Sequence, residues 1–171
     1  RVKSFTNFGD VNSTTDDYTS TISYYKNQTL TDKNITNIPS SIIVKNGSQT
    51  LRSRTTANIN NTTGAIGKII ATIDNTAGNT AETDLEYDTY GNLKKVTLPP
   101  NKNSERMFYS WTYDVDNSKY VNVVTDAKGY SSSSQYDPKF DALLSTTDIT
   151  GNVTQYQYDS YGRLIKVIGP N

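Results

Sequence analysis

Apolar and polar residues alternate with a period of two along much of this chain. Residues 18–25 alternate cleanly, and Met107, Tyr109, Trp111 and Tyr113 share one face of a second alternating segment. Such alternation predicts β-strands. The same pattern predicts strands at residues 119–125, 131–136, 143–147, 153–158 and 164–168. No segment of ten or more residues has a helical period, so the sequence predicts an all-β fold.

A short unit recurs between these strands. Its fullest copies run from Tyr158 to Leu164 (YDSYGRL) and from Tyr87 to Leu93 (YDTYGNL). A third copy begins at Tyr136, with Asp141 in place of glycine, and a fourth begins at Tyr113 and is stretched before Tyr120. The first tyrosines at 87, 113, 136 and 158 lie 26, 23 and 22 residues apart. A period of this length predicts a repeat architecture. Residues 5–11 form a fainter copy.

The residue types of the unit favour a hairpin turn. An aspartate can accept hydrogen bonds from backbone N–H groups two residues on, and glycine supplies the positive φ of a tight turn. We therefore interpret the positions that recur in each copy of the unit as structural turn residues, with the tyrosines as a ladder between neighbouring hairpins. These residues are Tyr87, Asp88, Gly91, Tyr113, Asp114, Tyr136, Asp137, Tyr158, Asp159 and Gly162.

A second set of turns falls about halfway between the first. It comprises residues 74–79, 126–130 and 148–152, with 98–101 and 169–171 where further members are due. A turn therefore occurs about every 11 residues. This spacing predicts a continuous antiparallel meander of β-hairpins with one set of turns at each edge.

The two halves of the chain differ in regularity. Residues 1–80 read as degenerate hairpins with an irregular loop near 26–39, and Asn46-Gly47 predicts a two-residue hairpin turn. Residues 81–171 read as regular repeats. Because Arg1 begins in what reads as mid-repeat, we expect one continuous β region that belongs to a longer protein.

Composition excludes several function classes. The chain has 17 basic and 17 acidic residues, which gives no electrostatic footprint for nucleic acid. No apolar run approaches the length of a membrane span. Cysteine and histidine are absent, which removes disulfides, the usual zinc ligands and Cys/His or Ser/His nucleophiles. We expect no catalytic residue, no metal and no cofactor.

Two sets of side chains could have a catalytic or binding role. The pairs Asp16-Asp17 and Asp114 with Asp116 could act as catalytic carboxylates or calcium ligands, but turn capping explains them better. The aromatic face around Trp111 could be a sugar-binding platform, although such a face is more often sheet core or shell lining.

The repeated tyrosine-aspartate units resemble the Rhs/YD-repeat family, and the irregular first half is most similar to the repeat region of the insecticidal toxin-complex B component. The resemblance implies a curved strip of β-hairpins that forms part of a hollow β-shell, or solenoid, around a toxin polypeptide. It also implies a secreted or cell-surface bacterial protein. The autoproteolytic aspartate signature of the family has no match here, so no proteolytic residue is carried over.

The leading hypothesis is therefore a non-enzymatic structural segment of a large Rhs-type protein. Its expected partners are the remaining repeats, the enclosed toxin polypeptide and, through unpaired edge strands, a second copy. The alternative is a cell-surface adhesion or carbohydrate-binding module on the same fold, with Trp111 as a glycan contact. A hydrolase is a distant third hypothesis.

Overall fold

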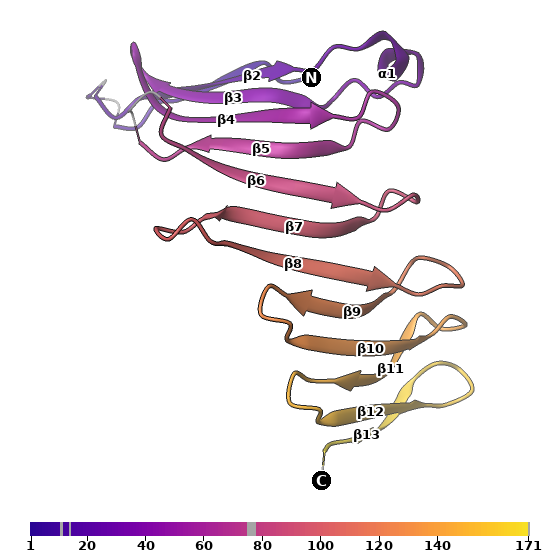
Figure 1. Cartoon of the computed structure of the whole chain (residues 1–171). Helices are drawn as coiled ribbons and strands as arrows, with labels where there is room; N and C mark the ends of the chain where they lie inside the picture. The colour runs from indigo at the N-terminus through magenta and orange to yellow at the C-terminus, as the bar shows by residue number, and fades with distance from the viewer. Residues whose placement is uncertain (11, 14, 75–77, 171) are drawn as a thin grey trace. The chain divides into compact units, whose positions relative to one another are not determined.

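The fold is an antiparallel meander of 13 strands, as a computed structural model shows for residues 1–10, 12–13, 15–74 and 78–170 (Figure 1). Each strand pairs with its sequence neighbours, in the order β1 to β13. The prediction of an all-β antiparallel meander is thus confirmed. In the described residues no helix has the length and apolar character needed to cross a membrane.

The first half of the chain contains six strands and one short helix. They are β1 (Ser4–Asn7), β2 (Tyr18–Tyr24), α1 (Gln28–Asp32), β3 (Pro39–Asn46), β4 (Gln49–Ile59), β5 (Ile66–Thr72) and β6 (Thr80–Tyr87). The second half contains β7 (Leu93–Pro100), β8 (Arg106–Tyr113), β9 (Val121–Asp126), β10 (Ser131–Asp137), β11 (Ala142–Thr147), β12 (Val153–Tyr158) and β13 (Leu164–Ile168).

The strands belong to two compact units. The first unit comprises residues 1–86 and 97–105, and the second comprises residues 87–96 and 106–171.

Very few side chains are buried in either unit. Among the described residues only Leu30, Ile38 and Ser20 are buried, at 1%, 8% and 3% exposure. A strand has two faces, and a sheet in which no second layer covers either face leaves most side chains half-exposed. The strands therefore hold together mainly through backbone hydrogen bonds and contacts between side chains of neighbouring strands.

The segment near residues 26–39 is more ordered than its polar sequence indicates. It contains α1, whose N-cap is Asn27, with Oδ1 accepting a hydrogen bond from Leu30 N at 3.2 Å. Leu30 and Ile38 bring apolar side chains into this segment, and a Cβ at Gly64 would lie 2.8 Å from Cδ1 of Ile38. An isolated helix of this length is unstable in water, so its formation depends on this packing rather than on propensity.

The hairpin at Asn46-Gly47 forms one residue later than the sequence indicates. Asn46 still pairs with Gln49, so the two linking residues are Gly47 and Ser48, and Gly47 has a φ of 53°. The turn expected over residues 74–79 lies partly outside the described residues. On its described flanks, Ile73 N donates to Asn79 O at 3.0 Å.

Candidate functional site: the turn ladder

Four five-residue turns share one hydrogen-bonding scheme. In the turn Asp159–Arg163, Asp159 N donates to Arg163 O at 2.9 Å and Gly162 N donates to Asp159 O at 3.0 Å. Oδ1 of Asp159 accepts from the N atoms of Tyr161 and Arg163, both at 2.9 Å. The glycine has a φ of 79°. The same scheme occurs at residues 88–92, 126–130 and 148–152.

These four turns, two from each of the sets that the sequence separates, are therefore chemically the same. Asp88 and Asp159 lie at one edge of the meander, and Asp126 and Asp148 connect strands at the other edge. In each turn one carboxylate oxygen accepts from two backbone N–H groups, which would otherwise have no intramolecular partner.

A further turn with the same scheme was missed by sequence reasoning. Oδ1 of Asn101 accepts from Asn103 N at 2.9 Å and Glu105 N at 3.1 Å, and Ser104 takes the glycine position with a φ of 64°. The position expected for this turn, residues 98–101, was wrong: the turn begins three residues later, at Asn101, because Pro99 and Pro100 end β7. The detectable signal was an Asn with a small polar residue three positions later.

The stretched turn after Tyr113 uses the same carboxylate over a longer span. Oδ1 of Asp114 accepts from Lys119 N at 2.8 Å and Tyr120 N at 2.7 Å, while Oδ2 accepts from Asn117 N at 2.8 Å. Ser118 adopts a φ of 50°. The carboxylate of Asp114 is thus occupied by backbone donors, which fits its interpretation as a turn cap.

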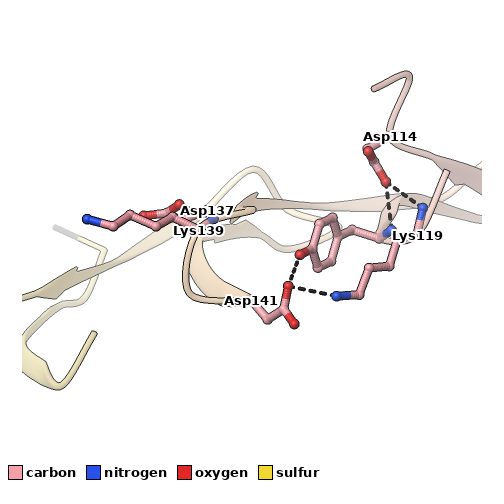
Figure 2. Close-up of polar contacts among 6 residues, drawn as sticks. Asp114, Lys119, Asp137, Lys139 and Asp141 are labelled. Carbon is pink, nitrogen blue, oxygen red and sulfur yellow. Dashed lines mark hydrogen bonds and ion pairs between the residues drawn. The ribbon is translucent and has the colours of Figure 1, made fainter. Parts of the chain in front are cut away.

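Asp141 links the third copy of the unit to the fourth. It has a φ of 53°, and its Oδ1 accepts from Lys119 Nζ at 2.7 Å and from the Tyr120 hydroxyl. Figure 2 shows the Lys119 side chain extended toward Asp141, and Asp114 holding the backbone on the other side of the same turn. In the same copy, Asp137 Oδ1 accepts from Lys139 N at 2.8 Å.

Contacts of this kind join all four consecutive turns at one edge, which we call the turn ladder (residues 88–92, 114–120, 137–141 and 159–163). Asn92 Nδ2 donates to Ser118 O at 2.7 Å, Lys119 pairs with Asp141, and Phe140 lies against Gly162. In Figure 1 these turns follow one another along the edge that carries the β8–β9 and β12–β13 connections.

The tyrosines of the repeated unit add cross-links beside the turn ladder. The Tyr113 hydroxyl donates to Leu93 O at 2.9 Å, and the Tyr158 hydroxyl donates to Leu143 O at 2.8 Å. Each acceptor lies just after the turn of the preceding copy. The Tyr136 ring stacks on Tyr120, with centroids 4.9 Å apart. Tyr87 ends β6 immediately before its turn.

Hydrogen bonds hold the pKa values of four turn aspartates below the ordinary value of an aspartate. Backbone hydrogen bonding by Arg163 lowers the pKa of Asp159, and backbone hydrogen bonding by Tyr120 lowers that of Asp114. Side-chain hydrogen bonds from Thr150 and then Asn152 lower the pKa of Asp148 strongly. The hydrogen bonds from Lys119 and Tyr120 lower the pKa of Asp141.

A groove of about 290 Å³ lies beside the stretched turn. It is lined by Asp114, Val115, Asp116, Asn117, Tyr120, Asn122, Gln135, Tyr136, Pro138 and Leu144. Trp111 does not line this groove and is opposite Val124 on β9. The aromatic rings that line the groove are instead those of Tyr120 and Tyr136.

The remaining acidic candidates are engaged in local hydrogen bonds. Asp16 Oδ2 accepts from Asp10 N at 2.7 Å and Asp17 Oδ1 accepts from Gly9 N at 3.3 Å, within the faint copy at residues 5–11, of which Val11 lies outside the described residues. In the part of the chain that the structure describes, no three His, Cys, Asp or Glu residues are grouped so that they could hold a metal ion.

These features define a class: a repeat sheet of β-hairpins in which consecutive turns contact one another along one edge. Residues 139–171 match the family model of the RHS Repeat. The chain therefore contains an RHS repeat, which covers part of the copy that begins at Tyr136 and the whole of the copy from Tyr158 to Leu164. No match was found among curated proteins.

Two glycines of the turn ladder give a matched test of turn contact. Alanine at Gly91 meets no heavy atom within 4 Å, so Gly91→Ala should cost only the left-handed backbone penalty of about 1–2 kcal/mol. Alanine at Gly162 also places Cβ 2.7 Å from Cδ1 of Phe140, so Gly162→Ala should lose about 1–3 kcal/mol more through overpacking. Urea unfolding followed by fluorescence of Trp111, the single tryptophan, measures both variants.

A Phe140→Ala background provides the control. There the two alanine variants should lose equal stability, because the clashing ring is gone. Equal losses in the native background would show that the contact between these two turns does not constrain the chain.

The lowered pKa values predict acid sensitivity. A carboxylate whose folded pKa lies below its unfolded value of about 3.9 contributes stability above that value and loses it as pH falls through the folded pKa. The urea midpoint should therefore fall between about pH 5 and the most acidic pH tested. Asp148→Asn keeps an oxygen acceptor but cannot titrate, so its midpoint should fall less over this window. If the urea midpoints of the native chain and of Asp148→Asn fell equally with pH, the acid sensitivity could not be assigned to the Asp148 carboxylate.

Proposed function

We propose that this chain is a non-enzymatic wall segment of a large, secreted or cell-surface Rhs-type protein, and that its sheet forms part of a shell around a polypeptide guest. The observation that carries the proposal is the sheet's lack of a covering layer. Only three of the described residues are buried, while seventeen large apolar side chains are exposed. A sheet of this kind needs further material against it.

The repeat chemistry supports a structural role. The same carboxylate clamp recurs in turn after turn, and its members face their neighbours rather than one shared cleft. Catalysis requires one asymmetric constellation of groups, whereas a wall requires the same contact many times. The proposed partners are the other repeats of the longer protein and the guest, with pairing of edge strands between copies as a further association.

Cysteine labelling of the two sheet faces tests the shell. The chain has no cysteine, so Tyr109→Cys and Thr112→Cys, exposed positions of opposite parity on β8, introduce one thiol on each face. In the longer protein one thiol should react with both a small maleimide and a maleimide carried on a large polyethylene glycol. The other thiol should react with the small reagent alone.

The isolated chain is the control, in which both thiols should react with both reagents. Equal access of the large reagent to both faces in the longer protein would overturn the shell role while leaving the repeat fold untouched.

The second candidate function is carbohydrate binding at a cell surface. The groove beside the stretched turn favours it, because the stacked rings of Tyr120 and Tyr136 lie near the amides of Asn122 and Gln135. Aromatic faces with a few polar groups are suited to sugars.

A glycan array of the purified chain decides between the groove and Trp111. Binding abolished by Tyr120→Ala but retained by Trp111→Ala would place the site in the groove, and the reverse would place it on the Trp111 face. An array without specific binding would contradict the carbohydrate function.

A further inference from the structure

Two arginines of the first unit lie side by side on one face of β4. Arg54 is opposite Ile42 on β3 and Ala71 on β5, and Arg52 is opposite Val44 on β3. Since alternate residues of a strand point to the same face, the two side chains start about 7 Å apart on one face. Both residues are exposed.

The surface around the arginines is hollowed and largely apolar. A groove of about 200 Å³ is lined by Ile42, Val44, Arg52, Ser53, Arg54, Ala71 and Thr72. Its aliphatic members are only half-buried. The groove thus combines an apolar floor with two guanidinium groups.

Strands β3 to β5 offer no acidic side chain that could form an ion pair with Arg52 or Arg54. Strands β3, β4 and β5 contain neither Asp nor Glu. Among the residues that the structure describes, no ion pair or side-chain hydrogen bond involves Arg52 or Arg54. Lys68 of β5, by contrast, pairs with Glu82 at 2.5 Å and Asp84 at 3.4 Å. Lys68 is opposite Ala57, three residues from Arg54, and so lies on the other face.

We propose that this groove binds an extended acidic polypeptide segment with two carboxylates two residues apart and an aliphatic side chain beside them. An extended chain repeats its side chains on one face with the same spacing as β4, which matches carboxylates to the two arginines. Guanidinium groups pair with carboxylates in a planar, bidentate geometry. The aliphatic side chain fills the groove over Ile42 and Val44.

Charge and composition favour a polypeptide over nucleic acid. Two guanidinium groups neutralise few phosphates, and the chain as a whole carries no net charge. A phosphate backbone makes no favourable contact with the apolar floor of the groove. This binding surface does not depend on the shell role, because it follows from the first unit alone.

Fluorescence anisotropy of a labelled peptide tests the proposal. The probe is an extended peptide with two glutamates two residues apart and a leucine, in a serine background. It should bind the whole chain, and binding should weaken with added salt. Arg52→Gln with Arg54→Gln should weaken it about tenfold or more per arginine, since each removes a charge-assisted hydrogen bond. The peptide with glutamine at both glutamate positions should bind weakly to the native chain.

Matched variants separate a site from general charge attraction. Lys94→Gln with Lys166→Gln removes the same charge from exposed positions outside the groove, and should leave binding unchanged. Arg52→Lys with Arg54→Lys should bind with intermediate strength. The proposal would be overturned if the arginine and lysine double variants lost the same affinity for the peptide, or if the native chain did not bind the peptide. Competition by a short oligonucleotide as strong as that by unlabelled peptide would also overturn it. Replacing leucine by serine without effect would overturn the apolar contact.

Discussion

Six turns between Asp88 and Arg163 each depend on one side-chain oxygen that accepts hydrogen bonds from two backbone N–H groups. In Asp159 this oxygen bonds the second and fourth residues after it, so the turn closes at a fixed length. A slip by one residue would transfer every side chain of the next strand to the opposite face. In a sheet with few buried side chains, the hydrophobic pattern alone gives little protection against that slip. The turn carboxylates therefore fix much of the register.

The contacts between turns extend this local order along the edge. The amide of Asn92 reaches Ser118 O, and the ring of Phe140 lies against Gly162. Each hairpin is thereby tied to its neighbour at the turn as well as along the strand. In repeat proteins stability is approximately the sum of the units and their nearest-neighbour interfaces. The turn ladder supplies an interface contribution that a strand edge alone would lack.

The sequence predicted strands β8 to β13 to within about two residues, because their alternation is strong and most of their turns carry Asp and Gly at fixed offsets. It also indicated the irregularity of the third and fourth copies. It did not reveal the turn at Asn101, where Asn replaces Asp and Ser104 replaces Gly while the backbone scheme stays the same. It also gave no sign of α1, whose five residues form through packing of Leu30. Local propensity is uninformative where tertiary contact decides the conformation.

Contacts between copies were the least predictable feature, because each joins residues about one repeat apart. Asp141 is the clearest case. In isolation, an aspartate where the other copies have glycine reads as a defect, since a left-handed backbone is unfavourable for a residue with a Cβ. The structure shows what the side chain adds: its carboxylate accepts from Lys119 and Tyr120 of the preceding turn. Glycine at this position would relieve the backbone and remove the link between the two turns. An exposed ion pair alone is weak, but here it acts together with a hydroxyl donor and with the stacking of Tyr120 on Tyr136. At Asp141 the departure from the repeat pattern therefore makes the turn itself less stable and adds a stabilising contact to the preceding turn.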